Sequence, residues 1–179
     1  MKLIMFDDLD LNGLGCAAYG TIKWHPIVIE EINGWSTAHS QGRRHRKVDK
    51  YGIDLIRKAL RIARSNAVEV ITPTKEKFNK AMAQYLSEAA SIKSNSADPK
   101  ENDCMLLYHS IEKNIYMMTN DDIVFKLGKK LNSDKSIQLE HFLVALCAEK
   151  VVTKERIKEF DKALNYYQEY LNSWVYSAI

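Results

Sequence analysis

Carboxylates follow two apolar segments that lie far apart in this sequence of 179 residues. Asp7 and Asp8 come directly after residues 3–6, and Asp121 comes shortly after residues 115–118. The apolar run of residues 3–6 predicts a strand that is buried on both faces of a sheet, and residues 115–118 predict another strand. Ligands bind beyond the carboxyl ends of the strands in open parallel sheets, so we expect these acids to lie at one sheet edge.

Two further segments can bring acids to the same edge. Asp103 is expected in the first turn of a helix, where the positive end of the helix dipole favours an anion. It stands 18 positions before Asp121, which leaves room for one helix and one return strand. Glu30 or Glu31, on a helix expected to begin at Pro26, can supply another acid.

A cluster of carboxylates needs a compensating cation, because several of them cannot all stay ionised side by side. Oxygen-only ligation favours a hard ion such as Mg²⁺ or Mn²⁺. An ion of this kind activates water and stabilises the charge on a phosphodiester. The pattern therefore predicts metal-assisted phosphodiester hydrolysis, although acids at strand ends and helix starts also serve as ordinary helix caps.

The elements that must position these acids alternate between strands and helices, which predicts a parallel sheet flanked by helices. Besides the two strands above, we expect strands at residues 67–71 and 136–139, and a loop at residues 36–50. The residues at which we expect helices to begin are Pro26, Asp54, Thr74, Asp98 and Asp121.

The last part of the chain predicts a long amphipathic helix. From Thr153 onward, apolar residues recur at alternating spacings of three and four, which is typical of a helical seam. The residues of this seam are Ile157, Phe160, Leu164, Tyr167, Leu171 and Trp174. We expect residues 151–179 to form an extension that packs on a domain of residues 1–150 or on a second copy in a homodimer.

Residues 98–121 resemble the second half of a PIN domain. In that family an Asp opens a helix, an apolar strand follows, and a Thr-Asn-Asp motif carries the last acid. Asp103 and the string Thr119-Asn120-Asp121 match these features here. Residues 3–7 are similar to the family's opening strand with its first Asp, and residues 26–32 look like its second motif.

The resemblance implies a PIN-like three-layer α/β/α sandwich with a short central parallel sheet. It also implies an endoribonuclease that cleaves RNA with Mg²⁺ or Mn²⁺, and toxins with antitoxin partners belong to this family. The hydroxyl of Thr119 would steady the acidic loop, and Asp8 and Asp122 are the nearest alternatives to the acids beside them. The catalytic residues and metal ligands carried over from the family are Asp7, Glu31, Asp103 and Asp121.

Two other functions stay open. A PIN-like domain without activity would serve as an RNA-binding or scaffold module. Residues 8–18 are similar to the opening motif of DHH phosphoesterases, although Asn12 stands where that family has Asp and its Asp-His-His string is absent. Either resemblance makes Asp8 and Asp10 candidates for metal binding.

Basic residues gather in one stretch, whereas the formal net charge of +3 is too small by itself to indicate a nucleic-acid binder. The densest cluster consists of Arg43, Arg44, Arg46 and Lys47. These side chains can follow an RNA backbone, or they can simply be solvated and balanced by Asp49 and Asp54. The next expected helix continues the positive charge with Arg57, Lys58, Arg61 and Arg64.

The composition favours a folded protein in a reducing compartment. Hydrophobic residues make up 46% and charged residues 27%, which allows both a core and a solvated surface. No apolar run reaches the length of about 18 residues that spans a bilayer, and no signal peptide is expected. The three cysteines are far apart, which is typical of free thiols. We therefore expect a cytoplasmic protein without a membrane partner.

Overall fold

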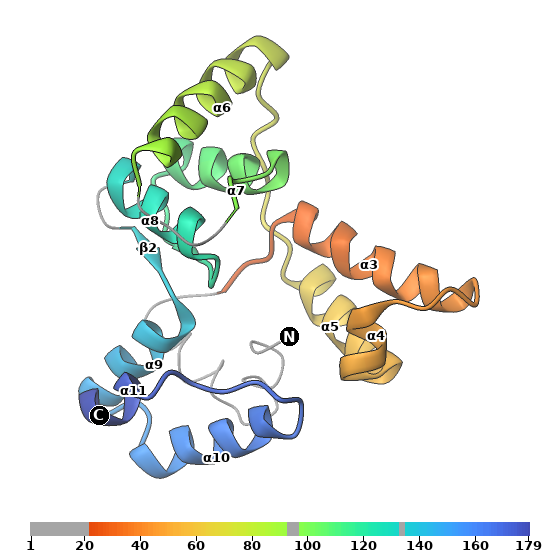
Figure 1. Cartoon of the computed structure of the whole chain (residues 1–179), viewed down its shortest axis with the longest axis vertical. Coiled ribbons are helices and arrows are strands. Elements are labelled where there is room, and N and C mark those ends of the chain that lie inside the picture. Colours follow the sequence, from red (N-terminus) through yellow and green to blue (C-terminus); the bar gives the residue numbers. More distant parts are fainter. Residues whose placement is uncertain (1–21, 93–96, 133–134) are drawn as a thin grey trace. The chain divides into compact units, whose positions relative to one another are not determined.

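The computed structural model describes residues 22–92, 97–132 and 135–179, and helices dominate these ranges (Figure 1). Contacts divide the chain into two units, one made of Met1–Val68 with Leu143–Ile179 and the other of Glu69–Phe142. We call Glu69–Phe142 the sheet unit, because it contains both strands of the described residues. None of the described helices is long and apolar enough to cross a membrane.

Three helices of the first unit share a hydrophobic core; they are α3 (Pro26–Ser40), α4 (Arg46–Tyr51) and α5 (Ile53–Ser65). α3 begins with Pro26, whose fixed backbone suits a first helical turn. The side chain of His25 caps this helix by accepting the N–H of Ile27 at 3.2 Å. Ile32 of α3 and Ile56 of α5 are buried in the shared core, so α3 and α5 hold each other in place.

The loop predicted for residues 36–50 is wrong over most of its length. α3 continues to Ser40 and α4 begins at Arg46, which leaves only a short turn between them. The pattern failed because these helical turns are largely exposed and need little apolar periodicity. In addition, His45 caps α4 by accepting the N–H of Lys47 at 3.3 Å, and histidine is not among the usual N-cap residues.

The C-terminal helices are α9 (Leu139–Ala148), α10 (Lys154–Asn165) and α11 (Trp174–Ala178). The hydroxyl of Thr153 accepts the N–H of Arg156 at 3.2 Å, so α10 begins where the sequence predicts. The prediction of one continuous helix is wrong, because the backbone turns after α10 through Gln168, whose φ is 54°. The carboxylate of Asp161 accepts the N–H of Leu171 at 2.8 Å and holds the returning chain against α10.

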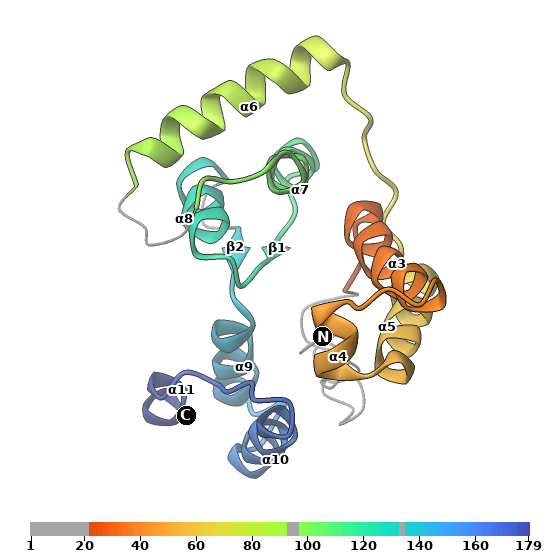
Figure 2. The same ribbon diagram turned by 45° about the vertical axis from the view of Figure 1, so that its right-hand side comes forward.

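The sheet unit contains α6 (Lys75–Ala90), α7 (Glu101–Glu112), β1 (Met117–Met118), α8 (Asp122–Leu131) and β2 (Ser136–Ile137). α6 passes over α7 and α8, and the two strands lie side by side (Figure 2). The strands are parallel, with Met117 opposite Ser136. Leu107 of α7, Met117 of β1 and Leu127 of α8 belong to one hydrophobic core, which fixes these three elements relative to one another.

The parallel pairing of β1 and β2 confirms part of the sequence prediction, because both fall within predicted strands. Each strand is only two residues long, so the described residues display the coarse part of the predicted α/β fold, namely helices and a small parallel sheet. The strand predicted at residues 67–71 is wrong, since Ala67 makes only an isolated parallel bridge with Trp24. The strand predicted at residues 3–6 lies outside the described residues.

Close packing between α8 and β2 depends on a glycine. A Cβ atom built on Gly128 would lie 2.5 Å from Oγ and 2.7 Å from Cβ of Ser136. Both distances are far inside ordinary van der Waals contact, so α8 can approach β2 this closely only without a side chain at that position. The glycine therefore sets how near α8 comes to the strand that follows it.

Candidate functional site

Asp121 lies where β1 leads into α8, and its carboxylate caps that helix. Its Oδ1 accepts the N–H groups of Ile123 at 3.1 Å and Val124 at 3.2 Å. The hydroxyl of Thr119 accepts the N–H of Asp121 at 3.1 Å. Asp121 is exposed, so its carboxylate is held in a fixed direction while it remains accessible from solvent.

The two residues before Asp121 tie this turn to neighbouring elements. The N–H of Thr119 donates to the carbonyl of Ile137 at 3.0 Å. The side-chain oxygen of Asn120 accepts the N–H of Leu139 at 3.2 Å. The Thr-Asn-Asp string thus connects β2, α8 and the start of α9. Sequence reasoning missed the role of Asn120, although its place inside the motif was a signal.

Asp103 lies in the first turn of α7, as the sequence predicts. Its Oδ2 accepts the N–H of Lys100 at 2.9 Å and caps the helix that begins at Glu101. The sequence placed this helix start at Asp98, but the helix begins at Glu101, and the carboxylate of Asp103 caps it through the N–H of Lys100. Next to this half-buried carboxylate, burial raises the pKa of the Cys104 thiol to about 11.

Asp122 differs from the neighbouring Asp121 in its partner. Its carboxylate forms an ion pair at 2.7 Å with Lys126, one turn further along α8. The ammonium group already balances the charge of Asp122, whereas Asp121 is held by uncharged backbone groups. Asp121 is therefore the better placed of the two to bind a cation.

The structure brings only part of the predicted set into one unit. Asp103 and Asp121 both belong to the sheet unit, on elements that share one core. Glu30 and Glu31 are exposed on α3, in the first unit. Three of the predicted acids lie outside the described residues, namely Asp7, Asp8 and Asp10.

The donor chemistry of Asp103 and Asp121 fits Mg²⁺ or Mn²⁺, since both ions prefer oxygen ligands. Capping uses one oxygen of each carboxylate, and a carboxylate offers about four lone-pair positions in all. Both side chains therefore keep acceptor capacity for a cation. Across the described ranges, no three His, Cys, Asp or Glu side chains gather closely enough to hold a metal ion. The described residues by themselves therefore do not form a complete metal site.

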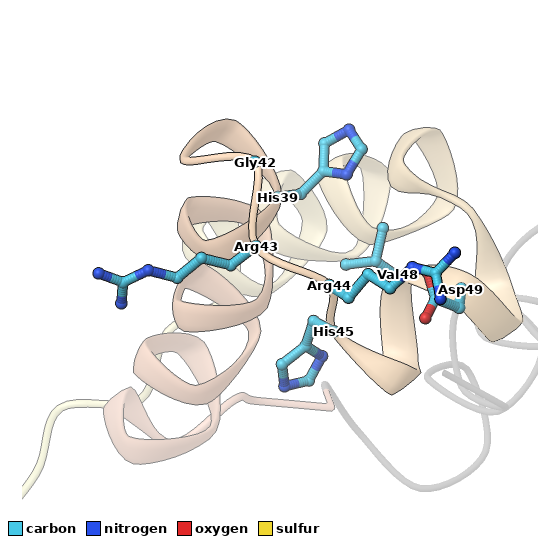
Figure 3. A pocket seen from close by; sticks show the side chains of 7 residues that line it. All are labelled: His39, Gly42, Arg43, Arg44, His45, Val48 and Asp49. Atoms are coloured by element: carbon cyan, nitrogen blue, oxygen red, sulfur yellow. The ribbon is translucent and has the colours of Figure 1, made fainter.

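Two of the predicted nucleic-acid residues, Arg43 and Arg44, line a hollow of about 260 Å³ at the turn between α3 and α4 (Figure 3). All four predicted nucleic-acid residues are exposed, namely Arg43, Arg44, Arg46 and Lys47. Arg43 and Arg44 line the hollow but point in opposite directions (Figure 3). Nζ of Lys47 lies 5.9 Å from the ring of Trp35 and 5.7 Å from the ring of Tyr51. These cations form a spread positive surface rather than a closed anion pocket.

Sequence reasoning missed the aromatic support of this basic turn. His45 stacks on Trp35 with ring centroids 6.0 Å apart and planes 26° from parallel. The same His45 caps α4 through Nδ1, which must be unprotonated to accept the hydrogen bond. Because a turn separates the two residues in sequence, helical periodicity gives no signal for their contact.

The described residues offer two backbone-anchored carboxylates in the sheet unit and an exposed basic surface in the first unit. Such carboxylates can hold a divalent cation, and such basic side chains can contact phosphates. We found no match to this chain among protein-family models, curated proteins or solved structures.

Proposed function

We propose that this protein is a PIN-like endoribonuclease that hydrolyses RNA with Mg²⁺ or Mn²⁺. The observation that carries the proposal is the placement of Asp103 in the first turn of α7 and of Asp121 at the end of β1, in one packed unit. This order of helix, parallel strand and helix is the one that the family resemblance implies.

The proposed metal ligands are Asp7, Glu31, Asp103 and Asp121. The bound ion would supply a water of lowered pKa and shield the charge of the scissile phosphate. Asp121 must keep a fixed direction for this role, and its hydrogen bonds to the first turn of α8 supply that direction. Thr119 and Asn120 act as positioning residues, because their hydrogen bonds fix the turn that carries Asp121.

A catalytically silent PIN-like RNA-binding or scaffold module is the second candidate, and one observation favours it. The backbone hydrogen bonds of Asp103 and Asp121 already account for both carboxylates as helix caps. RNA contact through exposed basic residues needs no metal ion. A module of this kind would work with an antitoxin-like or other protein partner, or as a homodimer.

Cleavage of a mixed single-stranded RNA pool with Mn²⁺, with Mg²⁺ and with EDTA tests the proposal. Asp103→Asn and Asp121→Asn each remove a negative charge but keep an oxygen that can accept the capping hydrogen bonds. We expect each substitution to lower the cleavage rate by about 100-fold or more, because a metal ligand is lost. Glu76→Gln is the matched control, since Glu76 is an exposed first-turn carboxylate of α6 in the same unit.

Two outcomes separate the candidates, and one control shows whether each variant folds. Metal-dependent cleavage that survives both Asn substitutions would reject this site. RNA binding without cleavage in either metal would select the silent module. Thermal unfolding of each variant distinguishes loss of a ligand from loss of the fold, because Asn ranks with Asp as a helix cap.

A further inference from the structure

The positive charge of this chain is concentrated in one stretch. Residues 22–68, which we call the basic segment, contain ten Lys and Arg residues but only four Asp and Glu residues. The rest of the chain contains sixteen Lys and Arg residues and nineteen Asp and Glu residues. The net charge of +3 therefore arises wholly from the basic segment. Segregation of this kind creates a local positive field even when the net charge is small.

The outer face of α5 carries a stripe of this charge. The buried residues of α5 are Ile56, Ala59, Leu60 and Ala63, and they form its inner face. Arg57, Arg61 and Arg64 are exposed and recur at spacings of four and three, so they lie along one side of the helix. At 1.5 Å per residue, the stripe extends about 10 Å along the helix axis.

Within the part of the chain that the structure describes, the partners of this stripe leave most of its charge uncompensated. Asp54 meets Arg57 at 4.0 Å, and the two side chains are 98% and 61% exposed. Exposed pairs of this kind contribute little and are screened by salt. Arg64 donates a hydrogen bond of 3.0 Å to the side-chain oxygen of Asn33, a neutral partner that orients the guanidinium without cancelling its charge.

The basic residues of α4 and the arginine stripe of α5 lie on helices that share one hydrophobic core. Val48 of α4, Ile56 of α5 and Ile32 of α3 belong to the same hydrophobic core. Arg46 and Lys47 of α4 are exposed, as the stripe is. The shared core holds the positions of these helices, so their basic side chains are presented without a folding step on binding.

We propose that the outer face of α5, with Arg57, Arg61 and Arg64, is an RNA-docking surface that binds the phosphate backbone without a metal ion. Each guanidinium offers a planar fork of N–H donors that suits phosphate oxygens. Each contact also releases condensed counterions from the RNA. The choice of RNA rests on the proposed ribonuclease function, whereas the binding itself does not use Asp103 or Asp121.

The experiment measures the binding of the full chain to a labelled single-stranded RNA in EDTA, by fluorescence anisotropy over a range of KCl concentrations. The test variant replaces Arg57, Arg61 and Arg64 with Gln, which keeps a similar helix propensity. The matched control replaces Lys75, Lys77 and Lys80 of α6 with Gln and so removes the same net charge from three exposed positions.

We expect the α5 variant to bind the RNA at least tenfold more weakly than the wild type at about 100 mM salt. The affinity of the α6 variant should stay within about twofold of the wild type. The slope of log K against log salt should fall in magnitude by about 2 in the α5 variant, at roughly 0.7 for each lost contact with a single strand. Unchanged binding by the α5 variant, or an equal loss in both variants, would overturn the docking surface.

Two further measurements keep the result interpretable. Thermal unfolding of both triple variants shows whether they fold, and the single substitution Arg61→Glu repeats the test with minimal change to the helix. Binding in EDTA and cleavage in Mn²⁺ are read separately. If the wild type does not cleave RNA but its binding depends on the α5 arginines, only the ribonuclease proposal is contradicted. If the wild type cleaves RNA but its binding does not depend on these arginines, only the docking surface is contradicted.

Discussion

In the basic segment the arginines of α5 stand on the side of a helix, whereas in the sheet unit Asp103 and Asp121 stand at the starts of helices. Arg61, for example, is exposed on the outer face of α5. Asp103 and Asp121 instead accept backbone N–H groups at the starts of α7 and α8. A charge on the side of a helix can bind a ligand without affecting the fold, while a charge at the start of a helix also stabilises that helix.

This difference means that stability and binding respond separately to substitution. Removing an arginine from the side of α5 should change affinity for a polyanion and leave folding nearly untouched. Removing a carboxylate from the end of a helix should change both folding and metal affinity, unless the replacement keeps the cap. Measurements of the free energy of unfolding can therefore test this difference without a binding assay.

The largest expected effect comes from the core of the sheet unit. Leu127 of α8 is 0% exposed, so Leu127→Ala should lower the free energy of unfolding by about 2–5 kcal/mol through lost burial and a residual cavity. Urea denaturation measures this loss. Leu86→Ala in α6 is the control, because Leu86 is 38% exposed and its truncation should cost less than about 1 kcal/mol. An equal loss of unfolding free energy in both variants would mean that Leu127 is not part of the core.

The next effect distinguishes two helical glycines, one in each region. Gly128→Ala should lower the free energy of unfolding by about 1–3 kcal/mol, because its methyl group would meet Ser136. Gly34→Ala in α3 should raise the free energy of unfolding by about 0.5–1 kcal/mol, since no atom lies within 4 Å of the added Cβ and Ala favours a helix. Thermal or urea unfolding of both variants shows whether the free energy of unfolding falls or rises in each.

A double substitution sharpens the assignment of the Gly128 effect. If the methyl group collides with Ser136, then Gly128→Ala should cost less when Ser136 is also changed to Gly. Additive costs in the double variant would mean that the collision is relieved by another movement of α8.

The helix-end carboxylate of Asp121 should give an effect of about 1 kcal/mol. Asp121→Ala loses the cap of α8 and should lower the free energy of unfolding by about that amount, whereas Asp121→Asn should stay within a few tenths. Arg61→Gln on the side of α5 should change the free energy of unfolding by no more than about 0.5 kcal/mol. If Arg61→Gln lost more unfolding free energy than Asp121→Ala, the proposed difference between residues on the side of a helix and residues at its start would be contradicted.

The sequence predicted those elements whose signals are local. Thr74 and Thr153 each precede a helical pattern, and both cap the helices expected after them. The parallel strands β1 and β2 also fall within predicted strands, and β1 lies in a short apolar run next to a polar turn. Sequence position likewise indicated that Asp103 would open a helix and that Asp121 would follow a strand.

The predictions that failed depend on tertiary contacts. α4 is capped by a histidine that stacks on Trp35, and no local pattern reports that contact. The seam from Ile157 to Trp174 has helical spacing throughout, yet the chain turns at Gln168 and Asp161 captures the returning backbone. Spacing alone cannot tell a continuous helix from two segments whose apolar side chains are both buried.

The smallest expected effect is a pH dependence from His109 in the sheet unit. Burial, followed by the charge of Lys113, lowers the pKa of His109 in the folded protein below its usual value of about 6.5. As the pH falls below that value, the unfolded chain binds a proton that the folded chain resists, so the free energy of unfolding should decrease between about pH 7 and pH 5. Urea denaturation at a series of pH values measures the slope, and His109→Gln should flatten it, because Gln cannot take up the proton. A slope that is the same in His109→Gln would assign the pH dependence to groups outside the core of the sheet unit.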